Sequence, residues 1–406
     1  MRLYRDVAPA MLVASVLALA ILLTVMGCGE DAESPAAPEP GPALATTSTA
    51  ALSFRQISAG AYHTCGVTTD NRAYCWGEST FGALGSGSTG DIIASTPVAV
   101  AGGLRFLVVN AGTSYTCGLT TEHYAYCWGL NSSGELGDGT TSNRSAPVAV
   151  AGGHQFRQVR ASYRYTCAVD LSDRAFCWGR NEFGQLGDGT TSQRLKPVRV
   201  TGGLSFDQVK TGGYHTCGVT TDHLVYCWGS NTEGQLGDGT LVQHLKPVAA
   251  LGGLSFASVA LGGRHTCGVT TTDRAYCWGF NGQGQVGDGT LTRRTRPRAV
   301  AGGLQFDGVT AGVEHTCGLT SGGATYCWGW NFYGQLGDGG TSDRWTPAAV
   351  AGGLQFSSVS AGVVGAHTCG VTTNARAYCW GWNSSGELGD GTTTSRSTPV
   401  AVIAPS

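Results

Sequence analysis

Paired cysteines are the residues of this chain whose type and spacing most directly suggest chemistry. Of the 15 cysteines, all but Cys28 form pairs whose members stand ten positions apart. Two thiols at this spacing could form a disulfide or supply part of a zinc site. Because one pair offers only half of a tetrahedral site, we expect seven disulfides and no metal. The expected pairs are Cys65 with Cys75, Cys117 with Cys127, Cys167 with Cys177, Cys217 with Cys227, Cys267 with Cys277, Cys317 with Cys327, and Cys369 with Cys379.

Histidine also recurs at one position in five of the seven repeats, and aspartate at one position in six of them. The histidines are His63, His215, His265, His315 and His367; the aspartates are Asp138, Asp188, Asp238, Asp288, Asp338 and Asp390. Packed sheets lie roughly 10 Å apart, so these histidines cannot converge on one zinc ion. A single carboxylate per loop falls short of the six or more oxygens that calcium takes. We interpret the histidines as hydrogen-bonded to a neighbouring turn and the aspartates as bonded to their own backbone.

No catalytic constellation accompanies these residues. The sequence contains neither a Ser/His/Asp order outside the repeats nor a HExxH motif. We therefore predict no catalytic residue, no cofactor and no enzymatic activity.

The elements that position the cysteines are short strands within a repeat of about 50 residues. In the fourth copy we expect strands near Phe206–Thr211, His215–Thr220, Leu224–Trp228 and Pro247–Ala250, separated by turn residues. If Cys217 faces Cys227 in a hairpin, Gly218 faces Tyr226 on the other side of the sheet. Seven such units predict an all-β, seven-bladed propeller of four-stranded antiparallel blades.

The repeat resembles that of the regulator of chromosome condensation family. The string Cys-Trp-Gly-x-Asn-x-x-Gly-Gln-Leu-Gly-Asp-Gly-Thr stands at 177–190 and 227–240, and variants of it extend the resemblance over residues 52–404. The resemblance implies a seven-bladed β-propeller. Its founding nucleotide-exchange activity depends on an inserted wedge that no copy here has room for. A secreted propeller of this fold inhibits β-lactamases through aromatic-rich loops, which makes protein binding the leading analogy.

We expect the ring to close by pairing of its terminal strands. The Gly-Gly between copies is a hairpin signal, so each blade would take its Pro-Val strand from the preceding copy. The strand at 399–402 would then complete the blade begun at 54–59.

The N-terminal residues predict export. Arg2 and Arg5 precede an apolar stretch that ends in Val25-Met26-Gly27-Cys28, which resembles a bacterial lipobox. We predict a signal peptide over residues 1–27, a lipidated Cys28 with a flexible tether over 28–51, and the propeller over 52–404. A plain transmembrane anchor is the alternative. Both predictions place the repeats outside the cytoplasmic membrane, in a bacterial cell envelope, with a lipidated protein at the outer membrane or cell surface.

The net charge and the variable loop residues narrow the class of partner that the chain could bind. A formal net charge of −2 without a basic run argues against nucleic acid. Aromatic residues and arginine gather at positions that differ between copies, which is typical of interfaces. The candidate binding residues are Arg180, Phe183, Phe280, Trp330, Phe332, Tyr333, Trp345 and Trp382. We expect a monomer that touches the membrane only through its anchor and binds an extracytoplasmic protein; a glycan or cell-wall ligand is the alternative.

Overall fold

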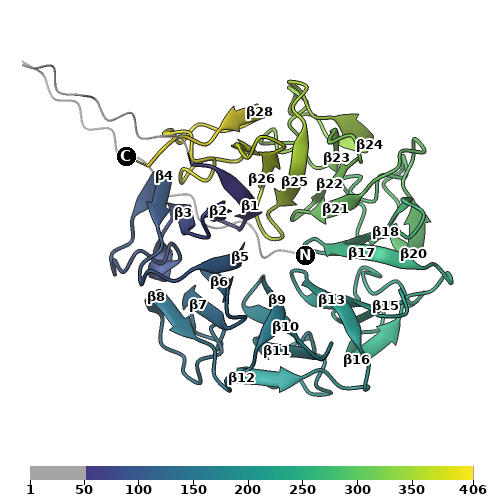
Figure 1. Ribbon diagram of the computed structural model, residues 1–406. Coiled ribbons are helices and arrows are strands. Elements are labelled where there is room, and N and C mark those ends of the chain that lie inside the picture. The colour runs from purple at the N-terminus through teal and green to yellow at the C-terminus, as the bar shows by residue number, and fades with distance from the viewer. Residues whose placement is uncertain (1–51, 406) are drawn as a thin grey trace, which may run out of the picture. The chain divides into compact units, whose positions relative to one another are not determined.

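The computed structural model describes residues 52–405, which form seven four-stranded antiparallel sheets arranged as the blades of a ring (Figure 1). Each sheet takes four strands that are consecutive in the sequence, with the first strand of each blade innermost. This confirms the predicted all-β, seven-bladed propeller.

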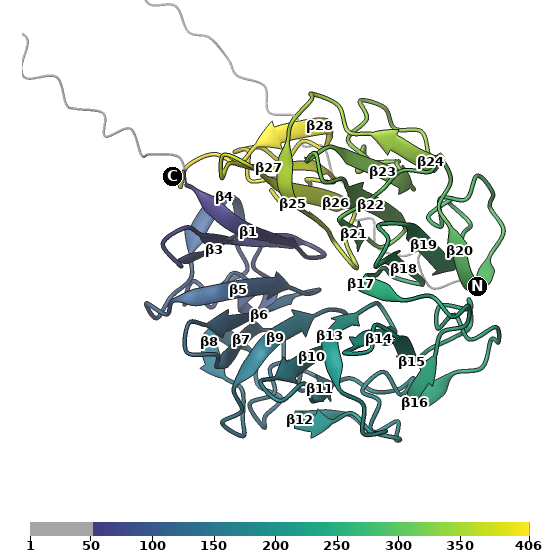
Figure 2. The same cartoon turned by 45° about the vertical axis from the view of Figure 1, so that its right-hand side comes forward.

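The blades follow one another around the ring in sequence order (Figure 2). Blades one to three contain β1 (Phe54–Ala59), β2 (His63–Thr68), β3 (Ala73–Glu78), the 3-10 turn η1 (Thr80–Gly82), β4 (Ile93–Ala99), β5 (Phe106–Ala111), β6 (Tyr115–Thr120), β7 (Ala125–Gly129), β8 (Arg144–Ala149), β9 (Phe156–Ala161), β10 (Tyr165–Asp170), β11 (Ala175–Gly179) and β12 (Arg194–Arg199). Blades four and five contain β13 (Phe206–Thr211), β14 (His215–Thr220), β15 (Val225–Gly229), β16 (His244–Ala249), β17 (Phe256–Leu261), β18 (His265–Thr270), β19 (Ala275–Gly279) and β20 (Arg294–Ala299). Blades six and seven contain β21 (Gly308–Ala311), β22 (His315–Leu319), β23 (Thr325–Gly329), β24 (Arg344–Ala349), β25 (Phe356–Ala361), β26 (His367–Thr372), β27 (Ala377–Gly381) and β28 (Arg396–Ala401).

The predicted hairpin register is confirmed in the fourth blade. Cys217 lies opposite Cys227, and Gly218 lies opposite Tyr226. A Cβ on Gly218 would come within 2.4 Å of the Phe206 ring, so the ring that covers this glycine comes from the first strand of the blade.

A disulfide crosses the hairpin of every blade, as the cysteine spacing predicts. The two Cα atoms of each pair lie 4.0 or 4.1 Å apart, because the cysteines stand directly opposite each other on the second and third strands. The disulfides join Cys65 to Cys75, Cys117 to Cys127, Cys167 to Cys177, Cys217 to Cys227, Cys267 to Cys277, Cys317 to Cys327, and Cys369 to Cys379.

The hydrophobic core is divided among the seven interfaces between blades. Each interface buries a tryptophan from the third strand of one blade against the second and third strands of the blade before it, as Trp228 does against Tyr165, Cys167 and Cys177. The last interface joins Phe54, Ile57 and Trp76 of the first blade to the seventh. Because each blade buries its apolar residues against its neighbours, the loss of one blade would expose the core residues of the blades on either side.

The predicted closure by terminal strand pairing is wrong. The last strand, β28, pairs with β27 of its own copy, where Tyr378 lies opposite Ala401, and the first blade takes its own fourth strand, β4. The Gly-Gly between copies has both residues at positive φ, as in Gly102 (90°) and Gly103 (67°), but it leads from the outer strand of one blade to the inner strand of the next. It is therefore a connection between blades and not a hairpin turn.

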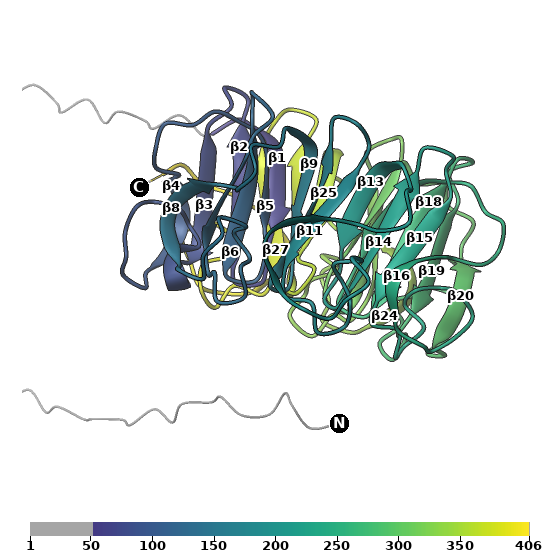
Figure 3. The ribbon, with the colours of Figure 1, turned by 90° about the horizontal axis from the view of Figure 1, so that it is seen from below.

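The two faces of the ring carry different connections. The turns between first and second strands and the long loops between third and fourth strands share one face, hereafter the loop face. The turns between second and third strands lie on the opposite face, hereafter the hairpin face; seen from the edge of the ring, the strands run from one face to the other (Figure 3). Within residues 52–405, no helix meets the length and hydropathy needed to span a bilayer.

Candidate functional site

The recurring histidines serve the contacts between blades. His215 Nε2 lies 2.8 Å from Thr266 Oγ1 of the next blade, and that hydroxyl donates to the Gln235 carbonyl at 2.8 Å. Because the hydroxyl has one proton, His215 must donate through Nε2, which leaves its buried Nδ1 as an acceptor without a partner. Burial accordingly lowers the pKa of His215 to about 3. The predicted bond to a neighbouring turn is corrected: the histidines bind a strand hydroxyl of the next blade.

The recurring aspartates organise the long loops of the loop face. Asp188 accepts from the backbone N–H of Thr190 at 3.0 Å, as predicted, and also pairs with Arg194 at 2.7 Å. Asn181 donates to Asp188 and to the Thr190 carbonyl. This clamp holds the loop that carries the variable residues, and within residues 52–405 no group of three His, Cys, Asp or Glu side chains is suited to a metal ion.

Four of the predicted binding residues form one cluster on the loop face, hereafter the aromatic patch. It consists of Trp330, Phe332 and Tyr333 from the sixth blade and Trp382 from the seventh. The Tyr333 and Trp382 ring centroids lie 4.2 Å apart across the blade boundary, and Trp330 stacks on Phe332 with an interplanar angle of 11°. Phe332 is 65% exposed, whereas the other three rings are partly buried. The patch is thus a supported platform with one ring projecting from it.

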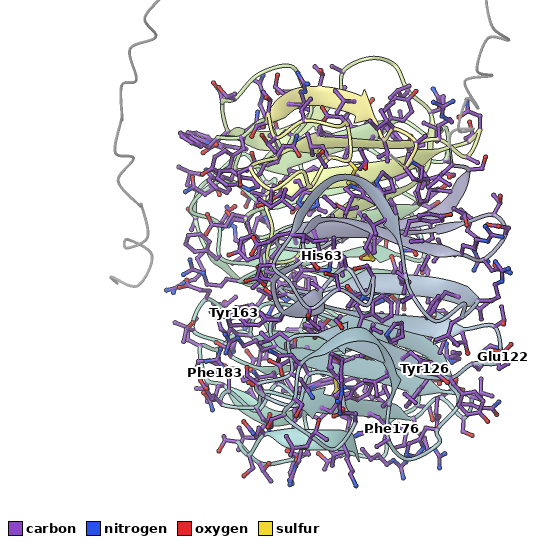
Figure 4. The ribbon with its side chains drawn as sticks, turned by 90° about the vertical axis from the view of Figure 1, so that its left-hand side faces the viewer. His63, Glu122, Tyr126, Tyr163, Phe176 and Phe183 are labelled. Carbon is purple, nitrogen blue, oxygen red and sulfur yellow. A yellow bond between two sulfur atoms is a disulfide. The ribbon has the colours of Figure 1, made fainter. Side chains whose placement is uncertain are left out.

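A second cluster on the same face joins the third and fourth blades. Phe183 packs edge-on against Tyr214 with ring centroids 5.4 Å apart, and Tyr214 contacts Tyr163 at 5.1 Å. The Arg180 guanidinium lies 5.4 Å from the centre of the Tyr163 ring and pairs with Glu182. Tyr163 and Phe183 lie on one side of the molecule, and Glu122 of a hairpin turn lies on the other (Figure 4).

The two remaining candidates lie outside both clusters. Phe280 sits under the Arg264 guanidinium at 4.8 Å, and Arg264 also reaches Glu314 of the sixth blade at 3.4 Å. Trp345 is the second residue of the outer strand β24, is 48% exposed, and packs against Gly284 of the fifth blade. Sequence reasoning did not select Tyr163, because its role follows from the packing of one blade on the next and not from the repeat pattern.

Comparison with known proteins agrees with this architecture. The RCC1-like domain profile matches residues 24–307. The chain belongs to the RCC1-like domain family. Two profiles for the regulator of chromosome condensation (RCC1) repeat match the later blades of this RCC1-like propeller, one at residues 306–335 and 356–387 and the other at 322–371 and 374–406.

Individual relatives share the fold of the RCC1-like propeller at low identity. The ultraviolet-B receptor UVR8 of Arabidopsis thaliana is 32% identical over 124 residues, which span 29% of this chain and 27% of the receptor. Human WBSCR16 superposes with a TM-score of 0.70 at 21% identity, over 77% of this chain and 85% of that one. Prp20p of Saccharomyces cerevisiae, studied for its binding to Gsp1p and histones, gives 0.72 at 22%, over 86% and 87% of the two chains. Propellers of this family often mediate protein binding.

Proposed function

We propose that this RCC1-like propeller is an exported, lipid-anchored, non-enzymatic scaffold that binds another extracytoplasmic protein through its loop face. The observation that carries the proposal is the aromatic patch, in which four rings from two blades support one another while Phe332 projects into solvent. Aromatic residues are enriched at the centres of protein interfaces, where they bury large area with few rotatable bonds.

The packing of the rings favours a protein over a glycan partner. Sugar rings stack on an open, flat aromatic face, but Trp330, Tyr333 and Trp382 are partly buried, and Tyr333 stands nearly perpendicular to the other two rings, at 81° and 79°. The exposed part of the patch is therefore ridged, which suits an apolar pocket on another protein. Glycan binding remains the second candidate because Trp345, 48% exposed and outside the patch, could offer such a face.

Site-specific photocrosslinking in the native host tests the binding surface. A photoreactive phenylalanine analogue at position 332 should capture one envelope protein reproducibly. Tyr124 provides the matched control, because it is 42% exposed but follows β6, in the hairpin-face turn. Equal capture from positions 332 and 124, or capture of polysaccharide alone, would contradict the proposal. Purified candidate partners, including extracytoplasmic enzymes assayed for inhibition, should then bind the Phe332→Ala variant more weakly than wild type and the Tyr124→Ala variant as well as wild type.

The disulfides support the exported location. Disulfides persist in oxidising compartments, and all 14 cysteines of the blades are paired. Cys28 and the proposed signal peptide and tether lie outside the described residues. We propose that Cys28 is the lipidated mature N-terminus, because it is the one cysteine without a repeat partner and follows an apolar stretch. The Cys28→Ser variant should lose membrane attachment or processing, whereas unchanged processing with retention would favour a transmembrane anchor.

A further inference from the structure

One residue from the inner strand of each blade faces the axis of the propeller. It is the residue directly opposite the first cysteine of each disulfide, and the seven together are hereafter the axial ring. The ring consists of Ser58, Asn110, Arg160, Lys210, Ala260, Thr310 and Ser360. All seven line an axial cavity of about 220 Å³, which the inner strands β1, β5, β9, β13, β17, β21 and β25 surround (Figure 1).

Three members of the axial ring have a structural role. Ser58 Oγ accepts from the Ala111 N–H at 3.1 Å, and the Thr310 and Ser360 hydroxyls accept from the inner strands of their next blades in the same way. These hydroxyls join adjacent inner strands. This role explains the axial-ring residues of three blades. In the fifth blade, Ala260 makes no polar contact through its side chain.

The second, third and fourth blades differ, because their axial-ring residues are hydrogen-bond donors that line the cavity. Arg160 donates from its guanidinium to Asn110 Oδ1 at 3.0 Å. Arg160 Nε and Asn110 Nδ2 are then buried without a partner, and Asn110 is only 8% exposed. Lys210, from the next blade, adds a second cation to the same cavity.

No acid balances these charges. The residues that line the cavity include neither Asp nor Glu, and within residues 52–405 neither Arg160 nor Lys210 forms an ion pair. Burial and the charge of Arg160 hold the pKa of Lys210 well below its ordinary value, and burial lowers the pKa of Arg160 to about 10. Two confined cations destabilise the fold unless an anion offsets them.

We propose that the axial cavity is a binding site for a small oxyanion of the phosphate or sulfate type, held by Arg160, Lys210 and Asn110. The planar guanidinium matches the oxygens of such an anion, and Lys210 supplies a point charge beside it. Asn110 Nδ2 offers a further donor. The cavity volume of about 220 Å³ is many times the roughly 10–15 Å³ that one water molecule needs, so the cavity has room for such an ion with part of its hydration shell. Val363, in the turn after β25, also lines the cavity, so the anion would enter from the loop face.

Calorimetric titration of the purified protein with inorganic phosphate tests the site, with sulfate and acetate in separate titrations. Lys210→Ala and Arg160→Gln should each weaken phosphate binding by about tenfold or more, because each removes a charged partner. Each variant has a control in its own blade with the same change of charge. These controls are Lys246→Ala and Arg199→Gln, whose side chains are exposed on the outer strands; they should bind phosphate as wild type does.

Thermal melting supplies a second measurement that does not depend on calorimetric signal. In anion-free buffer Lys210→Ala should melt above wild type, because it relieves the repulsion from Arg160. Added phosphate should raise the melting temperature of wild type more than that of Lys210→Ala. The proposal is overturned by absence of phosphate binding to wild type, by equal binding to Lys210→Ala, or by an equal loss in Lys246→Ala. Preference for acetate over both tetrahedral anions would overturn the assigned ligand class.

Discussion

Thr64 and His367 meet across the boundary between the seventh and first blades, with 2.8 Å between the Thr64 hydroxyl oxygen and His367 Nε2. The same hydroxyl donates to the Glu387 carbonyl at 2.8 Å, and the Trp76 indole N–H donates to that carbonyl at 2.9 Å. An equivalent set joins the fourth and fifth blades through His215, Thr266 and the Gln235 carbonyl. The ring therefore closes with the same side-chain contacts that join its internal blades.

Thr64→Val should destabilise the protein as much as the same change at an internal boundary. Valine keeps the shape of threonine but leaves the buried His367 N–H without an acceptor, which costs about 1–3 kcal/mol. The measurement is the free energy of urea unfolding, and Thr266→Val is the matched variant. If Thr64→Val were neutral while Thr266→Val lost stability, closure would rest on other contacts.

The buried histidines should make the propeller sensitive to mild acid. Burial lowers the pKa of His63 to about 4 and those of His215, His265, His315 and His367 to about 3, from an ordinary 6.5. Below pH 6.5 the unfolded chain therefore binds protons that the folded chain excludes, and stability falls as the pH falls. At pH 5 the loss approaches about 2 kcal/mol per histidine. Five such losses are comparable to the whole stability of a typical domain.

Melting temperatures between pH 7.5 and 5 measure this effect. His215→Tyr supplies the comparison, because the second and third blades already carry Tyr115 and Tyr165 at this position, and their hydroxyls donate to carbonyls of the next blade. The variant should melt close to wild type at pH 7.5 and lose less on acidification. An identical pH dependence in both proteins would contradict the assignment.

Most of the fold could be predicted because each feature of the local sequence pattern recurs in the repeats. The cysteine spacing and the Gly/Tyr alternation specified the hairpin register, and Phe206–Thr211 and His215–Thr220 were placed at their observed bounds. The way in which the ring closes could not be predicted from the repeat. Gly-Gly at positive φ suits both a hairpin and a link between blades, and the strand pairing distinguishes them, as in Tyr74 opposite Ala99 and Tyr378 opposite Ala401.

The candidate site was predictable only in part for a related reason. Departures from the repeat identified Trp330, Tyr333 and Trp382, whose rings meet because adjacent loops pack side by side. The two cations Arg160 and Lys210 were not predicted as site residues, although most other copies have a small residue at this inner-strand position. A strand position alone does not reveal that it faces the axis; that follows from the curvature of the whole ring.

The hairpin disulfides should contribute measurable stability. Thiol titration of denatured, unreduced protein should detect none of the 14 blade cysteines as free thiols. Replacing Cys217 and Cys227 together by alanine should lower the free energy of unfolding by about 3 kcal/mol or less, since the closed loop is short. Fourteen reactive thiols in protein exported by its native host would contradict the pairing.

Glu387→Gln should stabilise the propeller at alkaline pH and have less effect in mild acid. Glu387 is buried in the last long loop, with Oε2 accepting from the Ser385 N–H at 2.8 Å and Oε1 without a partner. Burial raises the pKa of Glu387 from 4.5 to about 7, so between these values the folded chain holds a proton that the unfolded chain has released. Stability therefore falls as the pH rises through this window and stays low above it.

Glutamine is the natural occupant of this position in four other blades and cannot ionise; Gln335 Oε1 accepts from the Tyr333 N–H in the same geometry. The gain at pH 8 should reach up to about 3 kcal/mol, reduced because the Nε2 of Gln335 also lacks a partner and the variant would share that cost. Urea unfolding at pH 5.5 and pH 8 makes the comparison, and the difference between wild type and variant should grow with pH. A difference that is the same at both pH values would show that Glu387 carries its charge throughout this range.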